Sequence, residues 1–359
     1  MIKKRRDIYS LFGVLILIIL IISILLVKLM DNKKKIKNDN ITTPSNNQST
    51  NVGNENLFTD LNRLSAWIVY WDLDVDEEMK ILDKKLSSLS YFAANFNEEN
   101  QLVIPDKLIE YYNESKSYNF KKYITIVNDV VYDNGKSTLK DKDILSKVLS
   151  DEVSRTNHVD EIIELAKRYD FDGIEIDYEQ IKDDLDLWYN FMLFINELYE
   201  SANSNGLDIR IILEPNVPFD KVDFVKGPTY VMMCYNLHGP FSEPGVKSNK
   251  KFIEDLIEKM EKIDSNKEFA IATGGFDWGK DGKTNSVSEL EAKKILSEYN
   301  VEVQRDSDSK YLYFYYTDKK NVKHEVWYAD KITLEYLFNV VIESGYDFSL
   351  WRLGGNLFH

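Results

Sequence analysis

The chain has few of the residues that build disulfide frameworks and zinc sites. Cys234 is the single cysteine, so no intramolecular disulfide can form and the fold must be held by its hydrophobic core. The four histidines, at positions 158, 238, 324 and 359, show none of the short spacings of zinc ligands. We therefore expect neither a disulfide-rich module nor a metal or other cofactor.

Negative charge outnumbers positive charge beyond the first 56 residues. The whole chain has 45 Lys and Arg against 60 Asp and Glu, a net charge of −15. Residues 1–56 carry nine basic and four acidic side chains, a net of +5, which leaves −20 for residues 57–359. Such an acidic domain should repel nucleic acid and anionic polymers, so no nucleic-acid partner is expected.

A long apolar run occurs near the N-terminus. Residues 11–27 read LFGVLILIILIISILLV, and Lys28 can reach the interface, so that the span continues to residue 30. A cleaved signal peptide is the alternative, but no small-x-small cleavage site follows the run. We expect a transmembrane anchor over residues 11–30, preceded by basic, cytoplasmic residues 1–10.

The segment after the anchor differs from both of its neighbours. Residues 31–57 lack the apolar side chains of a core and read as a flexible polar linker. Lys and Arg flank both ends of the apolar run, so the positive-inside rule does not set its orientation. Because an N-terminal anchor with a polar tether usually leaves the large domain outside, we expect a single-pass cell-membrane protein with residues 58–359 extracytoplasmic.

From residue 65, short apolar strands alternate with amphipathic helices. The predicted strands are 65–71, 89–96, 123–129, 173–179, 207–215, 229–236, 269–276 and 348–353, and helix-like segments include 159–169, 185–206 and 288–299. Eight such units predict an α/β fold, a closed (β/α)8 TIM barrel. The alternative is a doubly wound open sheet, but no Gly-rich phosphate loop follows the first strand.

One segment departs from the β/α rhythm. Residues 301–328 alternate like strands, with a turn near Asp318–Asn321, and predict a small β-rich insertion (about 300–328) before the last helix. Its tyrosines could line the wall of a cleft, or they could belong to a half-buried hairpin without any ligand.

Residues 171–180, FDGIEIDYEQ, place three acids at every second position. Glu175, Asp177 and Glu179 then share one face of a strand, and the apolar residues between them share the other. A solvated edge strand is the simple explanation, but the neighbouring strands read as a buried parallel sheet. Clustered buried acids usually mark a functional site, so we favour that interpretation.

Chemistry in a barrel lies at the carboxyl ends of its strands. The residues predicted at those ends are Trp71, Asn95, Asn128, Asp129, Glu179, Glu214, Tyr235, Asn236, Asp277, Trp278 and Trp351. Each alone is an ordinary strand-end or core residue. Together, the acids, amides and large aromatics suit a sugar site, because aromatic faces stack on pyranose rings and polar groups bind hydroxyls.

Three of these segments resemble the motifs of glycoside hydrolase family 18, the chitinase-like (β/α)8 enzymes. DGIEIDYE (172–179) is similar to the family's DGxDxDxE signature, and MCYN (233–236) to its MxYD motif. Trp351 stands where the family places the tryptophan floor of the −1 subsite. Residues 311–328 and 349–355 look like the subgroup that acts on bacterial cell-wall or polysaccharide glycans.

The resemblance implies roles for individual residues. Glu179 matches the general acid, Asp177 the acid that orients the substrate's 2-acetamido group, and Tyr235 the tyrosine that binds its carbonyl. The acetamido oxygen is the nucleophile in this family. Repulsion between Asp177 and Glu179 should raise a pKa within the pair, and Glu175 can extend their proton-sharing chain. Trp71, Asn236, Glu214 and Trp351 are expected to bind substrate.

Two residues depart from the family pattern. Glu175 stands where the family usually has Asp or Asn, and Asn236 stands where many members have Asp. The third predicted strand also ends in VND rather than SxGG. These departures leave the pH optimum, the rate and the exact substrate open.

Three functions remain to be separated. The favoured one is a monomeric hydrolase of β-1,4 bonds next to N-acetylhexosamine, in peptidoglycan or a chitin-like glycan; the acidic domain favours a neutral or cationic glycan. The second is a surface-tethered carbohydrate-binding pseudoenzyme, against which the retained Glu179 argues. The third is a metal-dependent barrel enzyme with Asp129, Glu179 and Glu214 as oxygen ligands. Endo and exo cleavage are both open.

Overall fold

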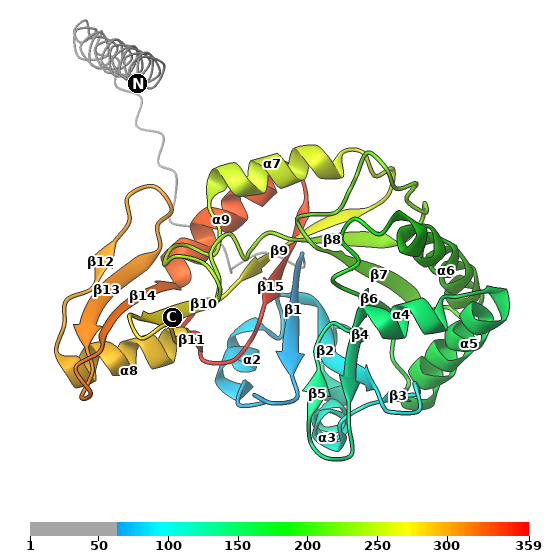
Figure 1. The fold of residues 1–359 in the computed structure, drawn as a ribbon, viewed down its shortest axis with the longest axis horizontal. Coiled ribbons are helices and arrows are strands. Elements are labelled where there is room, and N and C mark those ends of the chain that lie inside the picture. Colours follow the sequence, from blue (N-terminus) through cyan, green and yellow to red (C-terminus); the bar gives the residue numbers. More distant parts are fainter. Residues whose placement is uncertain (1–62, 359) are drawn as a thin grey trace, which may run out of the picture. The chain divides into compact units, whose positions relative to one another are not determined.

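Eight parallel strands close into a barrel in the computed structural model, which describes residues 63–358 (Figure 1). They are β1 (Leu64–Val69), β2 (Leu86–Phe96), β4 (Lys121–Val131), β6 (Gly173–Asp177), β7 (Asp208–Leu213), β8 (Thr229–Met233), β9 (Lys267–Ala272) and β15 (Asp347–Trp351). Each strand pairs with the next in this order, β15 pairs with β1, and β2 pairs with β4. The predicted TIM barrel is confirmed.

Helices surround the barrel on its outer side. They are α2 (Asp76–Leu82), α3 (Asp106–Glu114), α4 (Lys142–Val148), α5 (Glu152–Tyr169), α6 (Leu185–Ser204), α7 (Lys250–Met260) and α9 (Lys331–Glu343), with a 3-10 turn at Ser115–Ser117. Two short strands, β3 (Leu102–Val103) and β5 (Ser137–Thr138), extend β2 and β4 as hairpins. Figure 1 shows α5 and α6 side by side on the outer side of the barrel, where α5 contacts β6 and α6 contacts β7.

The alternation of β6 decides which side chains face the barrel axis. Ile174 and Ile176 belong to the main hydrophobic core, together with Phe194 and Ile195 of α6. The side chains between them therefore point to the inside of the barrel. Asp184 begins α6 by accepting a hydrogen bond from the backbone of Leu187 at 3.1 Å, which fixes the helix that covers this strand.

The insertion is larger than the sequence predicted. A five-stranded antiparallel sheet has the order β11-β10-β14-β13-β12, and its members are β10 (Gly274–Gly279), β11 (Thr284–Val287), β12 (Gln304–Arg305), β13 (Leu312–Thr317) and β14 (Lys323–Ala329). Helix α8 (Glu289–Tyr299), expected among the barrel helices, lies within this insertion. The predicted turn near Asp318–Asn321 is present, closed by Asn321 N–H to Asp318 O at 3.0 Å.

Glycine explains why the start of the insertion was misplaced. The predicted strand 269–276 divides in two, because β9 ends at Ala272 and β10 begins at Gly274, which has φ +57°. A Cβ on Gly275 would lie 1.7 Å from the carbonyl oxygen of Trp327, so only glycine allows β10 to pair this closely with β14. Hydrophobic alternation continues across the break and does not reveal that the chain changes sheet.

The predicted anchor (residues 11–30) and linker (residues 31–57) lie outside the described residues. Between residues 63 and 358, no helix combines the length and apolar character needed to span a bilayer.

Candidate active site

Glu175 lies deep inside the barrel and is fully buried. Its Oε1 accepts hydrogen bonds from Trp67 Nε1 and from Thr125 Oγ1 (2.8 Å), and its Oε2 accepts one from Ser90 Oγ at 3.1 Å. The guanidinium of Arg210 lies 3.3 Å away. Burial raises the pKa of Glu175, and the charge of Arg210 together with these donors opposes that rise.

Arg210 forms the centre of a buried ionic layer that the sequence interpretation missed. It pairs with Glu268 at 3.1 Å, donates to Ser88 Oγ at 3.0 Å, and lies over the Trp67 ring, 5.4 Å from its centre. The sequence LDIRIILEP (207–215) contained an indication of this role, because an arginine within an otherwise apolar strand usually makes a specific polar interaction. In the strand register Arg210 is the partner of Glu175, so the deepest acid has a cationic partner of its own.

Asp177 lies one pleat nearer the mouth of the barrel and is only 7% exposed. Its Oδ1 is buried and has no hydrogen-bond partner among residues 63–358. Burial, and then the neighbouring charge of Glu179, raise the pKa of Asp177 well above its usual range, with Lys140 opposing. An unsatisfied buried carboxyl is costly, and it suits a site that receives a polar ligand group.

Glu179 follows β6 rather than belonging to it, because the strand ends at Asp177 and not at Glu179 as predicted. Asn128 fixes its backbone at both ends: Glu179 N–H donates to Asn128 Oδ1 at 2.9 Å, and Asn128 Nδ2 donates to Glu179 O at 3.0 Å. Burial raises the pKa of the Glu179 carboxyl, the ion pair with Lys140 lowers it, and Glu214 adds repulsion.

Lys140 is the second functional candidate that sequence patterns missed. It lies on the loop between β4 and α4 with φ +54°, and its N–H donates to Asp129 Oδ1 at 2.7 Å. Its ammonium forms an ion pair with Glu179 Oε2. Burial lowers the pKa of Lys140, but the charge and hydrogen bond of Glu179, together with the charges of Asp177 and Glu214, raise it overall. No local pattern marks a loop lysine that meets an acid 39 residues later.

Aromatic side chains form a surface at the mouth of the barrel. The Trp351 ring packs edge-on against Phe92 and Trp67, with ring centres 4.9 and 5.8 Å apart. Tyr235 belongs to the same cluster and is buried. Burial, and then the charges of Asp177 and Glu179, raise the pKa of the Tyr235 hydroxyl, which is therefore a neutral hydrogen-bonding group at neutral pH.

A cleft of about 630 Å³ opens between these strand ends and the insertion. Trp351, Tyr235, Asn236 and Trp71 line it on the barrel side, and Trp71 is 55% exposed. Four predicted site residues are thus brought to one cleft. Asp177 and Glu179 are not among its lining residues.

Glu214 is placed differently from the prediction. Its carboxylate accepts hydrogen bonds from Gln180 N at 2.8 Å and Gln180 Nε2 at 3.4 Å, so it holds the segment after β6. It does not line the cleft. Among residues 63–358, no group of three or more His, Cys, Asp or Glu is arranged to hold a metal ion. Asp129, Glu179 and Glu214, the ligands of the metal alternative, instead have the separate partners described above.

Asp277 and Trp278, expected at the end of the seventh barrel strand, lie in β10 of the insertion. Asp277 accepts hydrogen bonds from Tyr316 Oη and His324 Nδ1, each at 2.7 Å. Trp278 Nε1 donates to Gly239 O at 3.2 Å, which ties the insertion to the loop after β8. Neither residue is among those that line the cleft.

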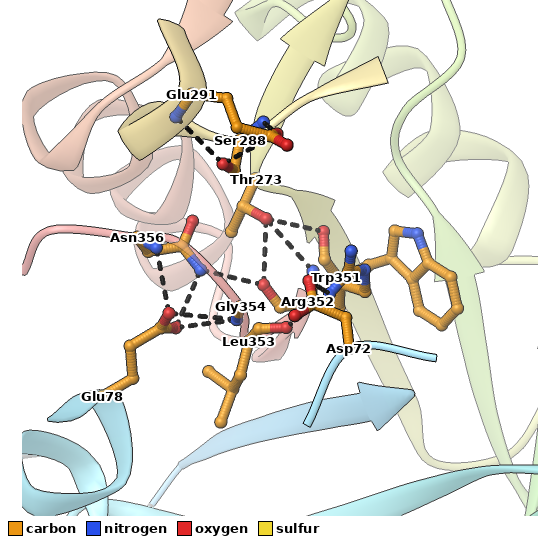
Figure 2. A network of polar contacts seen from close by, with 10 residues as sticks. All are labelled: Asp72, Glu78, Thr273, Ser288, Glu291, Trp351, Arg352, Leu353, Gly354 and Asn356. Carbon is orange, nitrogen blue, oxygen red and sulfur yellow. Dashed lines mark hydrogen bonds and ion pairs between the residues drawn. The ribbon is translucent and has the colours of Figure 1, made fainter. Parts of the chain in front are cut away.

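The segment after β15 is held by a polar network (Figure 2). Arg352 pairs with Asp72 at 2.7 Å, and the buried Glu78 accepts hydrogen bonds from Gly354 N at 3.0 Å and Asn356 N at 2.9 Å. Thr273 Oγ1 donates to Arg352 O at 2.9 Å. These contacts fix the chain directly after Trp351, and Figure 2 shows its indole beside this network.

Comparison with known proteins places the chain in a described family. The model of the glycosyl hydrolases family 18 matches residues 66–355. The uncharacterized glycosylase YvbX of Bacillus subtilis is 27% identical over 256 residues, which covers 66% of this chain and 72% of that protein. The cortical fragment-lytic enzyme of B. subtilis is 28% identical over 234 residues, covering 58% of this chain and 52% of the enzyme, so the chain spans about half of that relative.

Solved structures agree on the architecture. The spore cortex-lytic enzyme SleL of Bacillus cereus matches with a TM-score of 0.68 at 20% identity, over 82% of this chain and 71% of that one. A chitinase from Chromobacterium violaceum matches with a TM-score of 0.66 at 18% identity, over 82% of this chain and 95% of that one. At such identities the likeness shows the fold alone.

Proposed function

Because the chain belongs to the glycosyl hydrolases family 18 and is a glycoside hydrolase, we propose that it cleaves β-1,4 bonds next to N-acetylhexosamine in peptidoglycan or a chitin-like glycan. One observation carries this proposal: Asp177 and Glu179 lie two residues apart at the barrel mouth, both nearly buried, and their charges act on the hydroxyl of Tyr235, which shares an aromatic cluster with Trp351. The cortical fragment-lytic relative supports a substrate of this class.

The proposed reaction is substrate-assisted and retains the anomeric configuration. Glu179, protonated, gives its proton to the glycosidic oxygen as the C1–O bond breaks, and the substrate's own acetamido oxygen forms a bond to C1. Asp177, whose Oδ1 is unpartnered, accepts the acetamido N–H, and Tyr235 donates to the acetamido carbonyl oxygen. The Glu179 carboxylate then takes a proton from the water that attacks C1 and releases the product.

The environment of Glu179 supports its role as the acid. Burial raises the pKa of its carboxyl above the usual range, which favours the protonated form that a general acid needs. The ion pair with Lys140 favours the opposite state, and substrate must therefore displace or redirect this lysine before proton transfer. Asn128, which hydrogen-bonds both the backbone N–H and the backbone carbonyl of Glu179, keeps the acid in place during that exchange.

Hydrolysis by the full-length chain in detergent tests this proposal. Chitooligosaccharides and purified peptidoglycan, each with and without a chelator, should yield new reducing ends at the same rate in both conditions. Glu179→Gln keeps the shape and hydrogen bonding of the acid but has no proton to give, so turnover should fall by about 10²–10⁴-fold. Binding of oligosaccharide, measured by calorimetry, should persist because Asp177 and Tyr235 remain.

Three results would contradict the proposal. Near-normal turnover of Glu179→Gln on every glycan that the parent cleaves would remove Glu179 as the acid. Binding without cleavage by the parent would favour a surface-tethered carbohydrate-binding pseudoenzyme, and a rate abolished by the chelator would revive the metal-dependent alternative.

We also propose that residues 11–30 anchor the enzyme in the cell membrane, with the barrel extracytoplasmic. The apolar run and the polar tether after it support this placement. Protease added to intact cells should release a soluble fragment of about the mass of residues 57–359. A barrel that is protected until the cells are lysed would place it on the cytoplasmic side.

A further inference from the structure

Lys247 is a cation at the cleft that the proposed mechanism does not use. It lies on the loop between β8 and α7 and lines the cleft together with Tyr235 and Trp351. Its Nζ donates to the carbonyl oxygen of Thr273 at 2.8 Å and lies 4.8 Å from the centre of the Phe276 ring. Thr273 also bonds the backbone of Arg352, so Lys247 is held directly beside the aromatic floor.

The charge of Lys247 has no carboxylate partner within 4 Å among residues 63–358. Two other charged groups that line the cleft have partners. Arg352 pairs with Asp72 at 2.7 Å, and Glu291 accepts hydrogen bonds from Ser288 as part of the α8 capping box. Lys247 is therefore a half-buried ammonium in this cleft that has no carboxylate partner among the described residues.

Such a position is costly without a ligand. Burial, and then the charge of Arg352, lower the pKa of Lys247 to about 8. An ammonium has three N–H donors, and one of them is used by Thr273, which leaves two for a bound group. In a domain whose net charge is −20, an anionic substrate needs a local cation of this kind.

We propose that Lys247 anchors a carboxylate-binding subsite beside the Trp351 floor, and that the preferred glycan carries a free carboxylate on a sugar next to the cleaved bond. This proposal rests on the function proposed above and narrows its substrate class. Two sugar carboxylates have the required chemistry: the lactyl ether acid of a muramic-type sugar and the C6 acid of a uronate. Neutral chitin-like chains would bind in the same cleft but leave Lys247 unpaired.

Binding to full-length Glu179→Gln in detergent tests the subsite without relying on turnover. The first probe is a tetrasaccharide that alternates N-acetylglucosamine with N-acetylmuramic acid and has free lactyl acids, compared with its methylamide. The second is a tetrasaccharide that alternates N-acetylglucosamine with glucuronic acid, compared with its amide. We expect the acid to bind about 10- to 100-fold more tightly than the amide for one of these pairs, which identifies the source of the carboxylate.

Substitutions assign that preference to one side chain. Adding Lys247→Met should abolish the preference and leave the affinity for a neutral N-acetylglucosamine tetrasaccharide within about twofold of the Glu179→Gln parent. Lys247→Gln, which can still donate to Thr273, should behave in the same way if the first variant folds poorly. Lys294→Met removes the same charge from an exposed position in the cleft lining and should keep the preference, because exposed charges are screened.

Three results would overturn the subsite. The first is equal binding of acid and amide for both pairs. The second is a preference that survives Lys247→Met. The third is an equal loss in the Lys294→Met control, which would show that the general field of the cleft is responsible. Failure of the hydrolase proposal is separate from these outcomes, since it is read from cleavage by the parent enzyme.

Discussion

Two layers of buried acids inside the barrel differ in how their charges are compensated: an inner layer with Glu175 and Glu268, and an outer layer with Asp177 and Glu179 near the mouth. In the inner layer, Glu175 and Glu268 share Arg210, and serine, threonine and tryptophan donors complete their hydrogen bonds. In the outer layer, Asp177 has an unpartnered oxygen and Glu179 depends on one lysine from a loop. The inner acids are satisfied by the fold, whereas the outer acids are left with capacity for a ligand.

This difference separates residues that look alike in the sequence. Glu175, Asp177 and Glu179 form one alternating row, and we expected Glu175 to extend a proton-sharing chain. Its hydrogen bonds instead run to Trp67, Ser90 and Thr125, and none runs to Asp177 within the described part of the chain. We infer that Glu175 holds the barrel interior together and that the chemistry begins one pleat further out.

The largest expected effect comes from breaking the inner layer. Arg210→Met leaves Glu175 and Glu268 buried without their shared cation, and loss of one partner of a buried ion pair costs about 3–5 kcal/mol. The free energy of unfolding, measured by urea denaturation, should fall by that amount. Arg63→Met, which breaks the exposed 2.5 Å pair with Asp347, is the control and should cost under about 1 kcal/mol. Equal losses of unfolding free energy in both variants would show that the buried ion pairs of Arg210 stabilise the fold no more than an exposed ion pair does.

The two layers also differ in what the sequence could reveal. The acidic row, the eight strands and the aromatic strand ends follow from period-two patterns and family motifs, and the structure brings Trp351, Tyr235 and Asn236 to one cleft. The partnership of Arg210 with Glu175 depends on the register between β6 and β7, which no local pattern specifies. Lys140 was beyond prediction for a similar reason, because loop geometry alone brings it to Glu179.

A smaller effect, of opposite sign, is expected in the outer layer. The pKa of Asp177 is raised in the folded state, so ionisation disfavours folding, and the folded protein loses stability as pH rises above the ordinary Asp value of about 4. Asp177→Asn removes this charge and should increase the free energy of unfolding at pH 7 by about 0.5–2 kcal/mol, while hydrolysis of N-acetylated substrates falls.

The gain in Asp177→Asn should shrink as pH approaches 4, since the parent carboxyl is then neutral as well. Asp220→Asn, on the exposed pair with Lys262, is the matched control and should change stability by less than about 0.5 kcal/mol at any pH. A destabilised Asp177→Asn protein would mean that the outer layer, like the inner one, is built for stability.

The smallest effect concerns the ion pair that covers the acid. Glu179 must be protonated to act, so activity is lost as pH rises through the pKa of its carboxyl. Burial raises that pKa and Lys140 lowers it, and Lys140→Met should therefore raise it further. The basic limb of the kcat/KM profile should move to higher pH, and the change in rate at the optimum should be far smaller than the change caused by Glu179→Gln.

The control is Lys142→Met, which removes the same charge two residues away, where Lys142 pairs with Asp184 at 2.8 Å. This variant should leave the limb in place. An unmoved limb in Lys140→Met would show that the ion pair with Lys140 does not set the pKa of Glu179 in the free enzyme, because the kcat/KM profile reports the free enzyme.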